Sequence, residues 1–303
     1  MNNYLITVIG ATAIGKTALS IQLAKYFNAE IISCDSRQFF KEMTIGTAVA
    51  SAEELAAVTH HFIKNKSILD HYSVGQFEKD ALKKLDELFS KNNIVLMVGG
   101  SGLYTNAVLE GFDDFPNIDP EIRKKLNKQI ENGELEALQN LLKELDLESY
   151  QTIEIENPHR LIRALEICIG TGKPYSSFKN KDKTKRNFIP IKIGLMADRE
   201  IMYHRINQRV DLMLHEGLLE EAKKLYPHKE LNALQTVGYR ELFDYFDGKY
   251  TLEFAIEEIK KNTRRFAKRQ VTWNKKDETI HWFDFKTAAS EIIKKIETII
   301  QTD

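Results

Sequence analysis

Short apolar runs alternate with helix-like patterns in the first third of the chain. Leu5–Ile9, Glu30–Cys34 and Ile94–Val98 are largely apolar and have the length of buried strands. Between them, Lys16–Phe27 and Ser73–Phe89 carry apolar residues at the three- and four-residue spacing of a helix. Strands that alternate with helices in this way predict an α/β fold with a doubly wound parallel sheet.

The pattern changes after Gly111, where helix-like stretches follow one another without a strand. These stretches are Pro120–Asn132, Gly133–Asp146 and Pro158–Thr171. We therefore expect residues 116–185 to form an all-helical insertion domain. Residues 1–115 and 186–303 would form the core from which it extends.

The strand and helix patterns resume after the insertion. We expect strands at Ile189–Met196 and Thr279–Phe283 and helices at Arg199–Glu216, Leu252–Lys275 and Ala288–Ile300, with another helix from Leu218. Loops are expected at Ile45–Ala48, at His60–His61 and at the basic stretch Lys179–Arg186, the last of them mobile.

The turn between the first strand and the first helix has the spacing of a phosphate-binding P-loop. It has two glycines separated by four residues, followed by lysine and threonine, and it comprises Gly10, Ala11, Thr12, Ala13, Ile14, Gly15, Lys16 and Thr17. Its amides and the helix N-terminus would hold a di- or triphosphate. Lys16 would neutralise the phosphates and the Thr17 hydroxyl would bind magnesium. The alternative is a chance glycine turn, and the loop alone does not identify ATP.

Polar residues follow the second and third strands. Asp35, Ser36, Arg37 and Gln38 follow the second, and the glycine-rich turn Gly99–Tyr104 follows the third. In open α/β sheets this edge faces the ligand. Asp35 could be a general base or could only order magnesium. The Gln38 amide could read a base edge or merely cap the turn.

A basic helix face opens the last helix of the insertion. Asn157 has the chemistry of a helix N-cap. Arg160 and Arg163 share a face with His159, and such a group suits phosphate or base contacts. The alternative is a solvated face on which arginine pairs with Glu166.

Two further cationic groups lie on predicted helices. Arg205 and Arg209 are four residues apart, and one or both could reach a phosphate, whereas Asp211 could tie Arg209 into an ordinary ion pair. Lys260–Lys276 holds eight Lys or Arg, no acid and interleaved aromatics. That mixture suits a nucleic-acid backbone, although a solvated basic helix would have the same composition.

Composition narrows the class of protein. The 303 residues are 43% hydrophobic and 29% charged with a net charge of -1, so only the local clusters point to nucleic acid. Cys34 and Cys168 are too few for a disulfide framework or a four-cysteine zinc site. Because the first strand begins almost at once and no apolar run has membrane-spanning length, we expect a cytoplasmic protein without a membrane partner.

Together these stretches resemble the bacterial tRNA dimethylallyltransferase (tRNA isopentenyltransferase) family. The matching stretches, in family order, are GATAIGKT, DSRQFF, IGTA, HHFI, GGSGLY, NPHRLIRALEI, TGKP, RINQRVDLMLHEGLLEE, VGYREL and TRRFAKRQVTW. They cover nearly the whole chain, from Gly10 to Trp273. The departures from the usual family residues are Ala11, Ile14, Arg37, Phe40 and Ser101.

The resemblance implies a magnesium-dependent reaction on tRNA. A dimethylallyl group would pass from dimethylallyl diphosphate to N6 of the adenine 3′ of the anticodon, releasing pyrophosphate. Asp35 would be the base, Thr12 would orient the reacting groups, and Arg209 would stabilise the diphosphate. A monomer would hold the tRNA anticodon stem-loop through Asp35, Ser36, Arg37, Gln38, Ser101, Arg123, His159, Arg160, Leu161, Ile162, Arg163, Arg264 and Arg265.

Three other functions remain open. A P-loop small-molecule or nucleotide kinase would need the same phosphate cradle, but it would not account for the basic helix. An adenylate isopentenyltransferase would perform the same chemistry on free AMP, whereas the long helical insertion favours a large RNA. A non-catalytic tRNA-binding protein would not need Lys16, Thr17 and Asp35 together.

Overall fold

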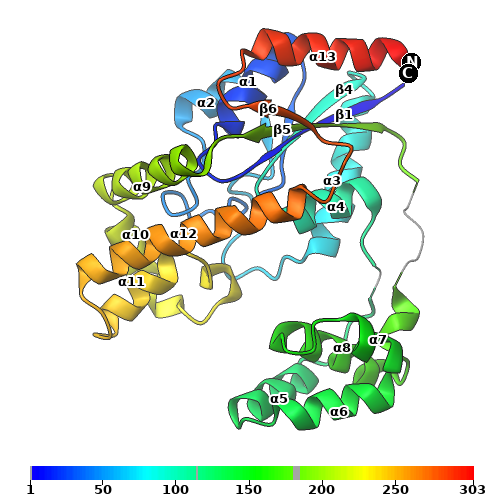
Figure 1. Ribbon diagram of the computed structural model, residues 1–303, viewed down its shortest axis with the longest axis vertical. Coiled ribbons are helices and arrows are strands. Elements are labelled where there is room, and N and C mark those ends of the chain that lie inside the picture. Colours follow the sequence, from blue (N-terminus) through cyan, green and yellow to red (C-terminus); the bar gives the residue numbers. More distant parts are fainter. Residues whose placement is uncertain (1, 114, 180–184) are drawn as a thin grey trace. The chain divides into compact units, whose positions relative to one another are not determined.

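The computed structural model describes residues 2–113, 115–179 and 185–303, and it divides the chain into two compact units (Figure 1). The core unit comprises Met1–Glu110 and Lys185–Asp303, and the helical unit comprises Gly111–Thr184. The divisions at 110/111 and 184/185 lie close to those expected at 115/116 and 185/186.

A six-stranded sheet in the order β3-β2-β4-β1-β5-β6 organises the core unit. All of its strand pairs are parallel. The strands are β1 (Tyr4–Gly10), β2 (Ile31–Ser33), β3 (His60–His61), β4 (Ile94–Val98), β5 (Ile189–Met196) and β6 (His281–Asp284). The predicted parallel α/β fold is therefore confirmed.

Helices cover both faces of this sheet (Figure 1). The helices α1 (Lys16–Tyr26) and α13 (Ala289–Thr302) contribute to the apolar cluster on one face. The helices α3 (Val74–Phe89) and α4 (Gly102–Glu110) contribute to the cluster on the other. Successive side chains of β1 enter opposite clusters because side chains alternate across a strand.

A third apolar cluster lies among the helices that follow β5. These are α9 (Arg199–His215), α10 (Leu218–Leu225), α11 (Tyr239–Phe246) and α12 (Leu252–Asn274), with short 3₁₀ helices at Tyr226–His228 and Asn232–Leu234. Tyr239 is fully buried in this cluster, which also takes in Phe40 and Met43 after β2. The cluster therefore packs against the loop that leaves the second strand.

The helical unit has its own apolar centre. Its helices are α5 (Pro120–Glu131), α6 (Leu135–Leu145), α7 (Leu147–Thr152) and α8 (Pro158–Thr171), followed by a 3₁₀ helix at Tyr175–Phe178. The Asn157 side chain accepts a hydrogen bond from the His159 amide at 3.1 Å, so Asn157 is the N-cap of α8 as predicted. Gly172 ends α8 with a left-handed φ of 67°.

Several short elements differ from the sequence-based expectation, and the eight-residue helix α11 is one that was not predicted. His60–His61 is a two-residue edge strand, not a loop, because it pairs with Ile31–Ile32 of β2. The six-residue helices α2 (Ala52–Ala57) and α7 were not predicted, since neither is long enough to establish a period. Residues 180–184 of the stretch expected as a mobile loop lie outside the described residues.

In the part of the chain that is described, no helix has the length and apolar character needed to span a membrane.

Candidate active site

The P-loop joins β1 to α1 at the carboxyl edge of the sheet. Gly10, Ala13 and Gly15 have positive φ angles of 149°, 61° and 112°. A Cβ at position 10 would lie 2.8 Å from the Leu195 carbonyl oxygen, so this turn requires glycine at that position. Because α1 begins at Lys16, the loop lies at the amino end of a helix, where free amides favour an anion.

Lys16 crosses the loop and lies beside a second cation. Its Nζ donates to the carbonyl oxygens of Ala11 at 2.8 Å and Gly10 at 3.1 Å. Burial and, second, the nearby Arg209 lower the pKa of Lys16 to about 8, and Asp35 acts in the opposite direction. Burial also lowers the pKa of Arg209. Burial disfavours the charged forms of both side chains. A bound anion would stabilise these two neighbouring positive charges.

The two arginines of α9 have different partners. Arg205 Nε donates to the Ala13 carbonyl oxygen at 2.8 Å, so Arg205 is attached to the P-loop backbone. Arg209 Nη1 lies 3.4 Å from the Thr12 hydroxyl oxygen. The alternative of an ion pair between Arg209 and Asp211 was wrong, because Asp211 pairs with Lys260 at 2.8 Å.

Gln270 of α12 connects the P-loop to the turn after β4. Its Oε1 accepts from the Thr12 amide at 2.9 Å, and its Nε2 donates to the Gly100 carbonyl oxygen at 2.8 Å. Gln270 is buried, and a Cβ at position 100 would lie 2.6 Å from its Nε2. The sequence analysis assigned no role to Gln270. The available signal was its position three residues after Ala267, which places both on the same, buried face of the helix.

Two cavities of the core unit meet at the residues predicted to be catalytic. The first, called the P-loop cavity, has a volume of about 710 Å³ and is lined by the P-loop and by residues 44, 45 and 47–51. The second, called the α12 cavity, has a volume of about 600 Å³ and is lined by the turns after β2 and β4 and by one face of α12. Thr12, Asp35 and Arg209 line both cavities. A ligand in one cavity could therefore react with a ligand in the other at this junction.

Asp35 stands at the end of β2 with one oxygen engaged locally. Its Oδ1 accepts a hydrogen bond from the Arg37 amide at 3.0 Å. Such an Asx turn fixes the orientation of the carboxylate. The carboxylate is therefore held at the junction and can accept a proton there.

Residues after Asp35 connect the turn after β2 to the turn after β4 and to the 3₁₀ helix at Asn232–Leu234. The Ser36 amide donates to Ser101 Oγ at 3.1 Å, and the Ser101 hydroxyl donates to Ser36 Oγ at 3.0 Å. Arg37 Nη1 donates to the carbonyl oxygens of Asn232 and Ala233 at 2.9 and 3.0 Å. Ser36, Arg37 and Ser101 line the α12 cavity. The Arg37 guanidinium also holds the 3₁₀ helix at Asn232–Leu234, just before Gln235, which forms the outer wall of this cavity.

Gln38 uses its amide within the protein. Its Nε2 donates to the carbonyl oxygens of Thr47 and Ala48, both at 3.1 Å. It lines the P-loop cavity and is absent from the lining of the α12 cavity. Of the two interpretations, the geometry favours a turn cap over a reader of a base edge.

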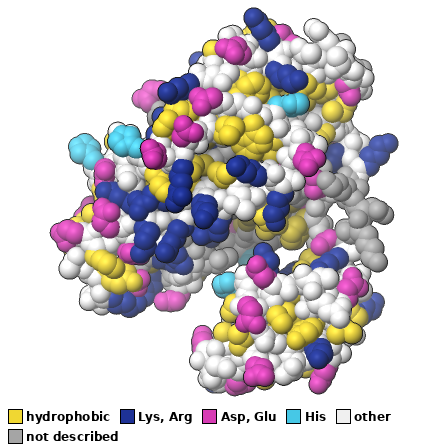
Figure 2. Space-filling view, viewed as in Figure 1, with side chains coloured by type: hydrophobic (Ala, Val, Ile, Leu, Met, Phe, Trp, Pro, Cys, Tyr) yellow, Lys and Arg dark blue, Asp and Glu magenta, His cyan; other side chains and the backbone are white. Residues whose placement is uncertain are grey.

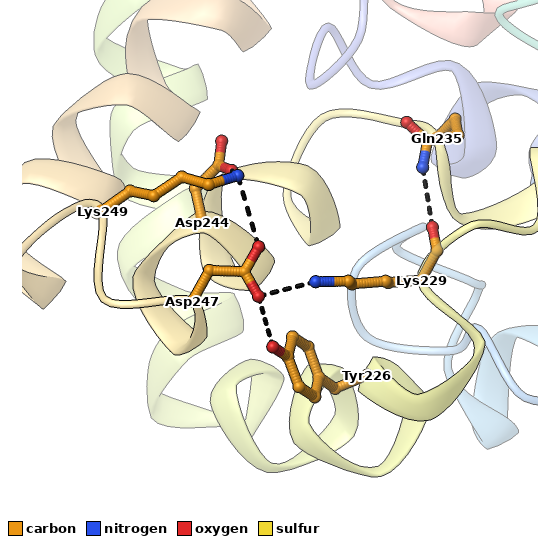
Figure 3. Close-up of polar contacts among 6 residues, drawn as sticks. All are labelled: Tyr226, Lys229, Gln235, Asp244, Asp247 and Lys249. Atoms are coloured by element: carbon orange, nitrogen blue, oxygen red, sulfur yellow. Dashed lines mark hydrogen bonds and ion pairs between the residues drawn. The ribbon is translucent and has the colours of Figure 1, made fainter.

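An exposed polar cluster supports the outer wall of the α12 cavity (Figure 3). The Asp247 carboxylate accepts from the Tyr226 hydroxyl and, at 2.6 Å, from Lys229 Nζ. Lys249 Nζ lies 3.3 Å from the other carboxylate oxygen. Gln235, which lines the cavity, donates to the Lys229 carbonyl oxygen at 2.7 Å. The hydrogen bonds from Lys229 and Tyr226 hold the pKa of Asp247 well below its usual range.

The exposed side of α12 is cationic. Figure 2 shows Lys and Arg side chains gathered along the part of the core unit that Figure 1 labels α12. Arg264 Nη1 donates to Asn207 Oδ1 at 2.7 Å, whereas Arg265 is exposed. Phe266 and Trp273 are 39% and 43% exposed and line the α12 cavity. Basic and aromatic side chains thus lie side by side at the rim of that cavity.

The arginines of the helical unit form ion pairs within that unit. Arg123 and Arg163 both contact the Glu166 carboxylate, at 2.8 and 2.9 Å. Burial alone would raise the pKa of Glu166, but the hydrogen bonds from both arginines outweigh it and hold the pKa below its ordinary value. Arg160 pairs with Glu154 at 3.0 Å. The alternative in which an arginine of this face pairs with Glu166 is therefore correct for Arg163. The side chains of Arg123 and Arg163 remain partly exposed.

Two of the predicted tRNA contacts are corrected. The side chains of Leu161 and Ile162 are 0% and 4% exposed and belong to the apolar centre of the helical unit. Their side chains lie on the inner face of α8 and do not face solvent. His159 and Arg160 are exposed on the same helix.

Comparison with known proteins identifies relatives over the whole chain. Residues 38–277 match the model of the family described as IPP transferase. The chain is 66% identical to the tRNA dimethylallyltransferase of Flavobacterium psychrophilum, with 98% of each chain covered. It is 64% identical to that of Christiangramia forsetii, with 100% of each covered.

Solved structures share the fold. The tRNA isopentenylpyrophosphate transferase of Bacillus halodurans superposes with a TM-score of 0.72 at 38% identity, covering 99% of this chain and 96% of its own. A eukaryotic dimethylallyltransferase solved while acting on tRNA gives a TM-score of 0.82 at 27% identity. That match covers 99% of this chain and 80% of the eukaryotic one.

Proposed function

This chain belongs to the IPP transferase family, and from that membership we propose that it transfers the dimethylallyl group of dimethylallyl diphosphate to tRNA. The acceptor is N6 of the adenine 3′ of the anticodon, and pyrophosphate is released. The observation that carries this reaction is the junction of two cavities at Thr12, Asp35 and Arg209. One cavity suits a diphosphate and the other suits a nucleobase.

The P-loop cavity suits the donor. Loop amides at the start of α1, together with Lys16 and Arg209, complement the charge of a diphosphate. In this reaction the diphosphate is the leaving group, so its negative charge grows as the carbon–oxygen bond breaks. Cations held in place before the reaction stabilise that charge most effectively.

Magnesium fits this cavity as a partner of the diphosphate. The Thr17 hydroxyl is the protein oxygen best suited to it. Among the described residues, no group of three or more His, Cys, Asp or Glu side chains could hold a metal. That sparse donor set suits an ion that keeps waters and phosphate oxygens as its other ligands. When bound, magnesium would neutralise charge on the leaving group.

The α12 cavity suits the acceptor adenine. Its aromatic side chains Tyr104, Phe266 and Trp273 offer stacking surfaces to a base that has left the anticodon loop. The N6 lone pair is delocalised into the ring, which makes the amine a weak nucleophile. As the bond from N6 to the allyl carbon forms and the bond to the diphosphate breaks, Asp35 accepts the proton from N6. Thr12, held by Gln270, orients the reacting groups.

Cationic surface on each unit suits the rest of the RNA. On the core unit these residues are Arg264 and Arg265, and on the helical unit they are Arg123, His159, Arg160 and Arg163. We expect the protein to act as a monomer in the cytoplasm, where its tRNA substrate is made. A P-loop kinase acting on a small molecule would not need this cationic surface.

The test is mass spectrometry of nucleosides after incubation of unmodified tRNA with the protein, dimethylallyl diphosphate and magnesium. Prenylated adenosine at the position 3′ of the anticodon is the expected product. Parallel reactions with ATP alone and with AMP as acceptor separate the alternatives. Phosphoryl transfer from ATP would favour the kinase, and prenylated AMP without prenylated tRNA would favour the adenylate enzyme.

A further inference from the structure

The loop Thr44–Ala48, called the clamp loop, borders both cavities of the active site. Gly46 and Thr47 line the α12 cavity, and the loop apart from Gly46 lines the P-loop cavity. It lies outside regular secondary structure, and Ala48 has a left-handed φ of 47°. Such a segment needs contacts from elsewhere to hold one conformation.

One carboxylate supplies most of those contacts. Glu221 Oε2 accepts from the amides of Thr44 and Ile45 at 3.0 and 2.9 Å. Its Oε1 accepts from the Gly46 amide at 2.9 Å and from the Tyr239 hydroxyl at 2.7 Å. An ionised carboxylate offers about four acceptor positions, and all of these are used here. Three consecutive loop amides are thus fixed by one side chain of α10.

The Tyr239 ring fixes the distance between the clamp loop and α11. Tyr239 is fully buried, and a Cβ at position 46 would lie 2.6 Å from its ring. The loop backbone therefore approaches the ring too closely for any residue except glycine. Gly46 and Glu221 together set where the loop lies.

The clamp loop in turn contacts the reacting groups. The Ala48 carbonyl oxygen accepts from Gln38 Nε2 at 3.1 Å and lies 3.5 Å from Arg209 Nη2. Arg209 lines both cavities and lies beside Thr12. A short chain of contacts therefore runs from Glu221 through the clamp loop to the arginine that faces the diphosphate.

We propose that Glu221 is a positioning residue for the donor diphosphate. It holds the clamp loop so that the Ala48 carbonyl keeps Arg209 in place beside the P-loop. This proposal rests on the proposed function. A glutamine at position 221 keeps the size but replaces one acceptor oxygen with a donor. That donor would face a backbone amide, so the loop would lose part of its attachment.

The test compares Glu221→Gln with Glu220→Gln, a change of the adjacent exposed glutamate on α10. Two quantities are measured: the KM for dimethylallyl diphosphate and the hydrogen exchange of the amides of residues 44–46. In Glu221→Gln we expect exchange of these amides to become about ten- to a hundred-fold faster, as for loss of a hydrogen bond to a charged group. KM should rise about ten-fold, while Glu220→Gln should match the wild type.

The KM separates positioning from simple destabilisation. A variant that is only partly folded has fewer active molecules, which lowers the apparent kcat and leaves KM unchanged. Wild-type KM and wild-type exchange in Glu221→Gln would overturn the proposal for Glu221. A wild-type protein that prenylates no tRNA would overturn the proposed function instead.

Discussion

The side-chain oxygen of Gln270 accepts a hydrogen bond from the backbone amide of Thr12 at 2.9 Å. These residues are far apart in the chain, and their contact attaches the long helix α12 to the P-loop. The same side chain holds the Gly100 carbonyl oxygen at 2.8 Å. The helix that carries the cationic surface is therefore tied to the phosphate cradle and to the turn after β4 by one amide.

Replacing Gln270 with alanine should reduce both stability and activity. The change leaves the Thr12 amide and the Gly100 carbonyl, both partly buried, without their partner. Such a loss costs about 1–3 kcal/mol in the free energy of unfolding. Thermal melts and steady-state kinetics with dimethylallyl diphosphate measure the two effects. The nearby exposed Thr272→Ala is the matched control, and equal behaviour of the two variants would contradict a linking role for Gln270.

The lowered pKa of Lys16 predicts a pH limit on donor use. Because the free enzyme holds Lys16 with a pKa of about 8, this side chain becomes neutral as the pH rises through that value. The neutral amine attracts a diphosphate less strongly, so kcat/KM for dimethylallyl diphosphate should fall above about pH 8. In Lys16→Arg the guanidinium stays charged, so any residual activity should not show this fall in kcat/KM at high pH. A wild-type profile that is flat to about pH 9.5 would contradict the prediction.

The cationic face of α12 predicts a salt dependence that the net charge of -1 does not. Arg265→Ala should weaken the binding of all tRNAs alike and reduce the slope of log affinity against log salt by about 0.7 to 0.9. Binding of an anticodon stem-loop at several salt concentrations measures both quantities. Lys294→Ala, an exposed change on α13, should leave the slope unchanged. Wild-type affinity and slope in Arg265→Ala would mean that this face of α12 is only solvated surface.

Features with a local signal could be predicted from the sequence. The P-loop, the long strands and the cap of α8 follow from spacing and residue type over a few positions, and the structure has them there. The elements that were missed include α2, α7, α11 and β3, which are too short to establish a period. Each depends on its caps or on pairing with a neighbouring strand.

Contacts between distant residues could not be predicted. Glu221 and Gln270 bind backbone groups of loops far away in the chain, and no periodicity reports such a partner. The error at Leu161 and Ile162 has a related cause. A family motif is continuous in sequence, whereas in a helix of about 3.6 residues per turn adjacent side chains point in different directions. The side chains of these two residues enter the apolar centre.

We propose that transfer occurs at the junction of the two cavities that Asp35 lines, with Asp35 as the base. The most direct measurement is the single-turnover rate of Asp35→Asn with a saturating anticodon stem-loop and dimethylallyl diphosphate. Asparagine keeps the shape but cannot accept the N6 proton, so the rate should fall by about a hundred- to ten-thousand-fold. Stem-loop affinity should change little, and the exposed Asp86→Asn should match the wild type. A wild-type single-turnover rate in Asp35→Asn would contradict the account.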